Sequence, residues 1–208
     1  KLINWALDIG SQQADALIAG RSMPPLLKAQ HAIADKLVLS KLRERVGLDQ
    51  MLLAVSGAAP VSPDALKFFI SLGLPMAEGW GMSESCHVGT LTPLEHPRPG
   101  TVGKPLPGVE VRIADDGELL VKSAGVMRGY RNSPAQTAEA IDPDGWLHTG
   151  DVATIDQDGY VHLIDRIKDL ILSAGFNVYP RMVEEAILLH PAVAEATVCG
   201  VPDSHRGE

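Results

Sequence analysis

Cysteine is scarce in this chain, and its scarcity excludes two kinds of scaffold. The 208 residues contain two cysteines, Cys86 and Cys199. They lie far apart in the sequence and do not have the spacing of zinc ligands, and two thiols cannot build a disulfide framework. We therefore expect two structural thiols in a protein of a reducing compartment, the cytoplasm.

The chain also lacks a surplus of basic residues and a long apolar run. It has 18 Lys and Arg against 26 Asp and Glu, for a formal net charge of −8. No clustered basic footprint exists, which argues against a nucleic-acid partner and limits any membrane association to a peripheral one. No apolar run reaches the ~18 residues of a membrane span, and the first residues lack a signal pattern. Any phosphate binding must be local, and the oligomeric state stays open.

The residues that are present suffice for a packed core, because 45% of them are hydrophobic. The first 47 residues have a helical pattern, with a second helix expected over 26–46 after the break at Pro24 and Pro25. These helices are expected to cover a sheet. The chain begins at Lys1 and ends at Glu208, which suggests a piece of a longer protein.

A strand, a helix and a second strand follow. The apolar run at 51–55 predicts a strand buried on both faces. Ser62 and Pro63 are placed to cap and open a helix that Gly73 ends, and a strand is expected over 74–77. A right-handed crossover then brings the loops 56–60 and 79–84 side by side, at the carboxyl ends of two parallel strands, where α/β sheets bind ligands.

Beyond residue 97 the composition changes to short β runs. The runs at 109–114, 117–123 and 127–130 predict a small barrel-like or sandwich-like subdomain, in which no chemistry stands out. A short helix over 133–141 follows, with Ser133 as its cap.

The segment from Gly145 to Glu185 carries the densest pattern. Asp151 follows Thr149 and Gly150, a sequence that predicts a tight turn at the mouth of a strand. Two alternating runs at 152–157 and 160–165 predict a ribbon joined by a turn at Asp158 and Gly159. A charged group at 165–169, an apolar strand at 170–172 and a helix opened by Tyr179 and Pro180 come next.

These motifs resemble the acyl-adenylate-forming (AMP-binding) enzymes, which include acyl-CoA synthetases, luciferase and peptide-synthetase adenylation domains. The resemblance rests on SGAAP (56–60), GWGMSES (79–85), TGD (149–151) and DRIKD…G…YP…VEE (165–185), in that order. Residues 41–85 resemble the long-chain fatty-acyl-CoA ligases throughout.

The resemblance implies a fold and a domain organisation. The fold is α/β, with a partial doubly wound sheet and flanking helices, a small β-rich subdomain and the beginning of a small α+β C-terminal domain. Residues 1–166 would be the C-terminal part of the large domain, divided into an α/β portion (1–97) and a β-rich portion (98–166). A hinge at 167–168 would precede the truncated small domain, 169–208, whose next strand is expected around 196–201.

The resemblance also assigns roles to particular residues. Two loops, a carboxylate and a guanidinium would bind the nucleotide. The loop residues are Gly57, Ala58, Ala59, Pro60, Gly79, Trp80, Gly81 and Ser83, and the charged residues are Asp151 and Arg166. Trp80 would offer its face to adenine, Ser83 its hydroxyl to the α-phosphate, and Asp151 would accept from the ribose hydroxyls. Glu84 would bind Mg²⁺, Lys168 would be the hinge, and Gly175 would line the tunnel for coenzyme A.

Each role has a plainer structural alternative. The loop 56–60 can be an ordinary strand-to-helix connection, and the glycine-rich turn can simply expose Glu84. Asp151 can bond its own backbone in a turn. Arg166 can form a surface salt bridge with Asp165 or Asp169. Trp80 stands where the family usually has Tyr, and Met182 stands where it often has Glu.

The implied reaction converts a fatty acid, ATP and coenzyme A to acyl-CoA by way of an acyl-adenylate, with Mg²⁺. The family's phosphate loop has no counterpart before Ser56, and its catalytic lysine is expected beyond Glu208. We therefore expect no catalytic residue in this chain and no ligase activity from the chain alone. Two alternatives stay open: another adenylate-forming enzyme, such as an aryl-CoA ligase or a peptide-synthetase adenylation domain, or a non-catalytic nucleotide-binding remnant.

Overall fold

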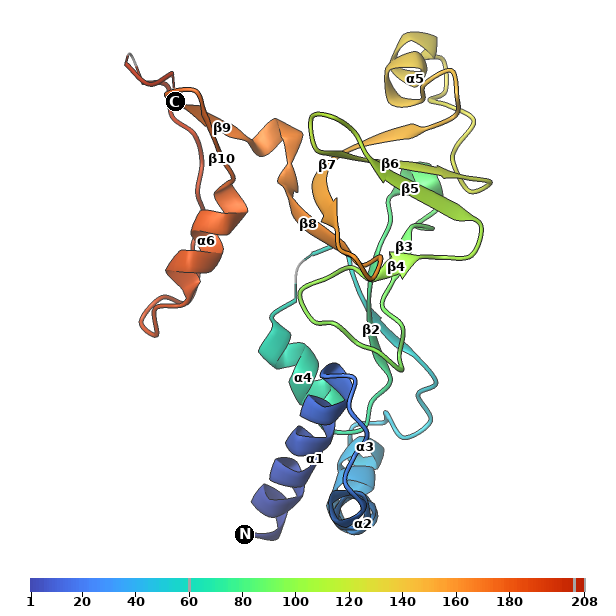
Figure 1. Ribbon diagram of the computed structural model, residues 1–208, viewed down its shortest axis with the longest axis vertical. Coiled ribbons are helices and arrows are strands. Elements are labelled where there is room, and N and C mark those ends of the chain that lie inside the picture. The colour runs from blue at the N-terminus through green and yellow to red at the C-terminus, as the bar shows by residue number, and fades with distance from the viewer. Residues whose placement is uncertain (60, 204, 208) are drawn as a thin grey trace. The chain divides into compact units, whose positions relative to one another are not determined.

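The structure is a computed structural model that describes residues 1–59, 61–203 and 205–207 (Figure 1). Pro60, one of the residues assigned to nucleotide binding, lies outside the described residues. The chain divides into two compact units. The N-terminal unit contains Lys1–Ser83 and His87–Leu106, and the C-terminal unit contains Glu84–Cys86 and Pro107–Glu208. The mixed α/β fold confirms the predicted fold class.

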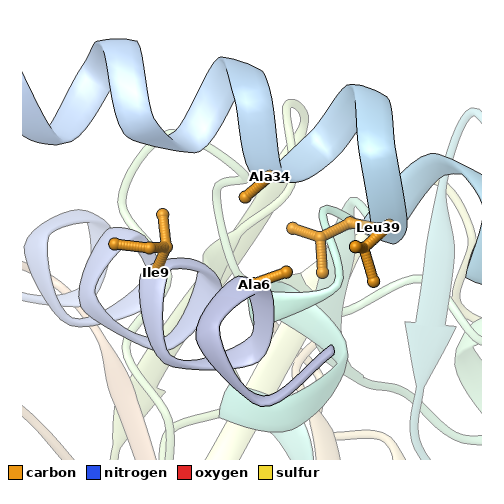
Figure 2. Close-up of a cluster of buried hydrophobic side chains, with 5 residues drawn as sticks. Ala6, Ile9, Ala34 and Leu39 are labelled. Atoms are coloured by element: carbon orange, nitrogen blue, oxygen red, sulfur yellow. The ribbon is translucent and has the colours of Figure 1, made fainter. Parts of the chain in front are cut away.

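The N-terminal unit begins with helices. α1 (Leu2–Ile18) is followed by α2 (Pro25–Ala34), which continues through a π-helical turn (Asp35–Leu39) into α3 (Ser40–Arg45). Buried side chains of α1 and of the second helical segment point toward one another (Figure 2). The members of this cluster are Ala6, Ile9, Ala34, Val38 and Leu39.

The other side of α1 packs against α4 (Pro63–Ser71), which lies beside it in Figure 1. Ala14 of α1 is buried with Leu66 and Ile70 of α4. Ser62 caps α4 as predicted, because its hydroxyl accepts from the backbone N–H of Ala65 at 3.1 Å.

The sheet of this unit has the order β1-β2-β3-β4, with only β1 and β2 parallel. The strands are β1 (Ala54–Ser56), β2 (Met76–Trp80), β3 (Thr90–Leu91) and β4 (Lys104–Pro105). The parallel pairing of β1 with β2 across α4 confirms the predicted strand-helix-strand crossover.

Two details of this sheet differ from the prediction. Residues 51–55 are not a strand buried on both faces: the side chain of Leu52 is 90% exposed and that of Val55 56% exposed. Leu52 lies before β1, which begins only at Ala54, and β1 is an edge strand that pairs with β2 alone among the described strands. The second strand was predicted over 74–77 but runs to Trp80, because antiparallel pairing with β3 extends it.

The larger sheet of the C-terminal unit is a four-stranded antiparallel sheet rather than a barrel or sandwich. Its order is β5-β6-β7-β8, with β5 (Val109–Ile113), β6 (Glu118–Ser123), β7 (Leu147–Ile155) and β8 (Val161–Arg166). The predicted run at 127–130 adds no strand, because the N–H of Met127 donates to the carbonyl of Glu84 and that of Tyr130 to the hydroxyl of Thr137. The short helix α5 (Pro134–Ala140) precedes β7, and the Ser133 hydroxyl before it donates to the Gln136 side chain rather than capping the backbone.

The ribbon of β7 and β8 is present, and the turn that joins its strands includes Asp158 and Gly159, as predicted. The strands last pair at Ile155 and Val161, and five residues join them. The carboxylate of Asp156 organises this loop by accepting from the N–H groups of Asp158 and Tyr160, both at 2.9 Å. The N–H of Gly159 donates to the carbonyl of Asp156 at 3.0 Å, and Gly159 has a left-handed φ of +83°, so the turn is a tight one.

The chain then forms a hairpin and a helix. The hairpin has β9 (Ile171–Ser173) and β10 (Phe176–Val178), and α6 (Pro180–Leu188) opens at Pro180 as predicted. No strand forms over 196–201, where one was predicted, and the N–H of Val198 donates instead to the carboxylate of Glu184 at 2.8 Å. Within the described part of the chain, no helix is long and apolar enough to cross a membrane.

Gly10 tests the contact between α1 and α4. A Cβ at this position would overlap the backbone carbonyl of Ser71. We expect Gly10→Ala to lower the free energy of unfolding by about 1–2 kcal/mol, because overpacking costs about 1–3 kcal/mol while Ala gains up to ~1 kcal/mol in helix propensity. Urea denaturation followed by circular dichroism measures the difference. The control is Gln12→Ala, a substitution at an exposed position of the same helix. A Gly10→Ala protein at least as stable as the unsubstituted chain would contradict the tight contact between α1 and α4.

Candidate functional site

In the N-terminal unit, the two predicted loops lie side by side. Ser56, the last residue of β1, pairs with Glu78 of β2. A Cβ on Gly57 would lie 2.8 Å from the carbonyl oxygen of Gly79, so the backbones approach closely there. Ala58 has a left-handed φ of +65°, and residues 57–59 are exposed. This exposed backbone of small residues is a surface on which a flat ring can lie.

Gly79 and Trp80 lie in β2 itself rather than in the loop that follows it. The half-buried indole ring of Trp80 lies against Gly89, where a Cβ would come within 2.9 Å of a ring carbon. Gly81 is held by a second close approach, because a Cβ there would meet the backbone of His87. Gly81 and Gly89 therefore have a packing role that is independent of any ligand.

Ser83 and Glu84 lie in a 3₁₀ turn, Ser83–Ser85, with Ser83 exposed. Within the C-terminal unit, the phenol of Tyr130 donates to Oε1 of Glu84 at 2.9 Å, and the N–H of Met127 donates to the Glu84 carbonyl at 2.7 Å. The hydrogen bond to Glu84 raises the pKa of Tyr130 above its ordinary value, with smaller contributions from burial and from the carboxylate charge. Glu84 is thus held at its backbone and at its side chain.

Asp151 lies inside β7, not in a tight turn at the mouth of a strand as predicted. Gly150 has a left-handed φ of +73°, and the register with β6 and β8 shifts nearby, so the TGD motif forms a β-bulge. The Thr149 hydroxyl donates to the carbonyl of Leu119 at 2.6 Å and accepts from the N–H of Asp151 at 3.1 Å. The bulge sets the position of the carboxylate on the strand.

The carboxylate of Glu118 holds this bulge from the neighbouring strand. Its Oε1 accepts from the N–H of Gly150 at 2.8 Å, and its Oε2 lies 2.7 Å from Nδ1 of His148. The Glu118 side chain is 9% exposed, so its charge is satisfied almost entirely by these partners and not by water.

The structure brings Asp151 and Arg166 together. The two residues pair across β7 and β8, and Nε of Arg166 lies 3.4 Å from Oδ1 of Asp151. The Asp151 side chain is 13% exposed and that of Arg166 61% exposed. Arg166 was weighed as a salt-bridge partner of Asp165 or Asp169, but Asp165 accepts instead from the backbone N–H groups of Arg166 and Arg181. A carboxylate can accept from a diol, and the planar N–H donors of a guanidinium beside it can donate to a phosphate.

The predicted hinge and the predicted coenzyme A residue lie further along the same unit. Lys168 lies in a 3₁₀ turn, Ile167–Asp169, at the edge of an open polar cavity of about 370 Å³. Gly175 follows Ala174 in the two-residue turn between β9 and β10, and both have a left-handed φ, of +83° and +52°. Such a turn favours glycine for its backbone alone, so the role of Gly175 toward coenzyme A stays a prediction.

Sequence reasoning missed Glu118 and Tyr130. Both lie in the β-rich part, where no chemistry was expected. A sequence signal existed for Glu118, because it is an acidic residue directly before the apolar run Leu119–Val121. No local signal marks Tyr130, since its partner Glu84 is 46 residues away.

Glu84 fits a metal that arrives with a ligand. Among the residues that the structure describes, no group of three side chains could hold a metal ion by itself. Mg²⁺ commonly takes only one or two carboxylate oxygens from a protein and fills its other positions with phosphate and water. The half-buried carboxylate of Glu84 matches that demand.

Comparisons with known proteins agree with this picture. The model of the family described as AMP-binding enzyme matches residues 15–131, and that of the AMP-binding enzyme C-terminal domain matches 182–208. Mycobacterium tuberculosis fadD11, named provisionally as a fatty-acid–CoA ligase, is 54% identical over 185 residues, 88% of this chain and 32% of that protein. The long-chain-fatty-acid–CoA ligase FadD15 of Mycobacterium bovis is 42% identical over 176 residues, 84% of this chain and 29% of that protein.

A solved structure is similar as well. O-succinylbenzoate coenzyme A synthetase (MenE) from Bacillus subtilis, in complex with ATP and magnesium ion, has a TM-score of 0.70 and 30% sequence identity. The match covers 89% of this chain and 43% of that chain. The chain thus spans about a third of the length of the curated relatives it matches.

Glu118 offers a test of how the bulge is held. We expect Glu118→Ala to lower the free energy of unfolding by about 2–3 kcal/mol, because hydrogen bonds to charged groups contribute ~1.5–3 kcal/mol and the Gly150 N–H loses its acceptor. Urea denaturation measures it. Glu110→Ala, an exposed acid on β5, should stay within about 0.5 kcal/mol of the unsubstituted chain. Equal effects of the two substitutions would show that the bulge does not depend on Glu118.

Proposed function

Because this chain belongs to the AMP-binding enzyme family, we propose that it is part of an ATP-dependent fatty-acid–CoA ligase. In the first half-reaction a fatty carboxylate attacks the α-phosphorus of ATP and pyrophosphate leaves. In the second, the thiol of coenzyme A attacks the acyl carbon, AMP leaves, and the thiol proton is released. The observation that carries the proposal is the pair of Asp151 and Arg166 on neighbouring strands.

Asp151 and Arg166 bind different parts of the nucleotide, the sugar and the phosphate. The Asp151 carboxylate accepts from the ribose hydroxyls, and the exposed guanidinium of Arg166 donates to ribose or phosphate oxygens. Glu118 acts behind them by holding the bulge.

In the N-terminal unit, the exposed backbone of Gly57–Ala59 and the indole of Trp80 are assigned to adenine, and the Ser83 hydroxyl to the α-phosphate. A flat base lies well against small residues and stacks on an aromatic ring. Gly79 and Gly81 serve this surface indirectly, because their close approaches hold β2 and the turn after it.

Glu84 is assigned to Mg²⁺ bound with ATP. The ion, when present, neutralises the negative charge that grows on the phosphate oxygens during the transfer. The contribution of this chain is to hold the carboxylate in place through Met127 and Tyr130. The magnesium complex of the MenE structure supports this assignment.

A fatty acid is the preferred acid class because both curated relatives are named for fatty acids. The likeness to o-succinylbenzoate coenzyme A synthetase keeps an aromatic acid as the second candidate. We place the protein in the cytoplasm, where the two exposed free thiols, Cys86 and Cys199, stay reduced. Any membrane association is peripheral.

Nucleotide affinity tests the proposal directly. We expect the chain to bind AMP weakly and Asp151→Ala to weaken this binding about tenfold or more, the loss of about 1–3 kcal/mol expected when a hydrogen-bonded acceptor is removed. Isothermal titration calorimetry measures both. The control is Asp115→Ala, an exposed acid in the turn between β5 and β6, which should bind like the unsubstituted chain. Equal affinity of the Asp151→Ala protein would remove the ribose assignment.

The hinge has a second test. Lys168 lies between Asp165 and Arg181 in the sequence, and the Asp165 carboxylate accepts from the backbone N–H of Arg181. Rotation at Lys168 must therefore break this hydrogen bond. In a full-length ligase that carries this chain, Lys168→Pro fixes φ and should block the rotation. We expect pyrophosphate release to survive and the acyl-CoA yield to fall at least tenfold.

Lys168→Ala is the matched control, because it removes the ammonium group and leaves φ free. It should keep both half-reactions. If Lys168→Pro and Lys168→Ala lose pyrophosphate release and acyl-CoA yield equally, the side chain acts in adenylation and Lys168 is not the hinge.

A further inference from the structure

We propose that Tyr130 is a positioning residue that orients the Glu84 carboxylate toward Mg²⁺ bound with ATP. This inference rests on the proposed function, since it presupposes that Glu84 meets the metal. It adds a residue to which neither the motifs nor the comparisons assign a role. It also explains why a phenol, rather than any aromatic ring, stands at this position.

The observation behind it is that Glu84 has two separate attachments. Its backbone carbonyl accepts from the N–H of Met127 at 2.7 Å, and its side-chain Oε1 accepts from the phenol of Tyr130 at 2.9 Å. The first bond holds the turn, and the second holds only the carboxylate. Loss of the phenol would therefore leave the backbone in place and free the side chain.

Tyr130 is itself held by α5. Its backbone N–H donates to Oγ1 of Thr137 at 2.9 Å, and the same hydroxyl donates to the carbonyl of Ser133, also at 2.9 Å. The residue before it, Gly129, has a φ of +142°, and a Cβ there would lie 2.5 Å from a methyl carbon of Thr137. The phenol thus projects from backbone fixed on both sides.

A free glutamate side chain has many rotamers, and a metal ligand must adopt one of them. One hydrogen bond to a fixed phenol selects the orientation before the metal arrives, which lowers the entropic cost of binding. Oε1 is the oxygen that Tyr130 holds. The expected consequence of losing the phenol is weaker coupling between Mg²⁺ and ATP, with metal-free nucleotide binding preserved.

The experiment measures ATP affinity of the 208-residue chain with and without Mg²⁺, and AMP affinity without metal, by equilibrium dialysis. The ratio of the two ATP affinities is the Mg²⁺ effect. We expect Tyr130→Phe to reduce this ratio about tenfold, the weight of one hydrogen bond to a charged group. The AMP affinity should not change. Tyr179→Phe removes the same atom from another tyrosine of the unit and is the matched control.

Two further variants guard against a folding defect. Thr137→Val removes the acceptor of the Tyr130 N–H and should also reduce the Mg²⁺ effect, whereas Thr137→Ser keeps that acceptor and should preserve more of it. Adding Tyr130→Phe to Glu84→Gln should change nothing more, because the carboxylate that the phenol orients is already gone.

Each outcome decides the matter. An undiminished Mg²⁺ effect in Tyr130→Phe overturns the proposal, and an equal loss of AMP affinity assigns Tyr130 a merely structural role, which also overturns it. If the unsubstituted chain shows no Mg²⁺ effect, the Glu84 assignment fails and the role of Tyr130 with it. AMP binding that depends on Asp151 would in that case still stand, so failure here is separate from failure of the proposed function.

Discussion

The buried carboxylate of Glu118 is the interaction on which the candidate site depends. It accepts from Gly150 and contacts His148, and so keeps β7 bulged where the strand carries Asp151. At the bulge, three residues of β7 lie opposite one residue of β6. Asp151 lies within this bulged segment and pairs with Arg166 of β8.

A similar arrangement recurs at Glu84. There, too, the position of a candidate ligand is set by hydrogen bonds from a distant segment, from Met127 and Tyr130, and not by its own neighbours in the chain. Arg166 is placed by strand register, and Asp165 beside it bonds the backbone at the start of α6. Polar atoms with defined partners are costly to displace, which suits the nucleotide-binding role that we propose for these residues.

The expectations that failed share a physical cause. The apolar run before Ser56 was read as doubly buried, but β1 is an edge strand and leaves Val55 half exposed. The TGD motif predicts a tight turn at the mouth of a strand, but pairing with β6 and β8 places Asp151 inside β7. In both cases the local sequence predicted the polarity of the segment correctly. It does not specify which strands pair with the segment, and those partners decided the outcome.

The amino-acid sequence by itself determined the order of the motifs, the crossover from β1 to β2, the Ser62 cap and the opening of α6 at Pro180. These features depend on residues within one or two turns of each other, so a local pattern suffices. Only the tertiary structure decided that β2 extends through Trp80, that Asp151 lies in a bulge, and that Glu118 bonds Gly150 and Tyr130 bonds Glu84. Those partners are 32 and 46 residues apart in the chain, and which atoms meet across such separations is set by strand register and packing.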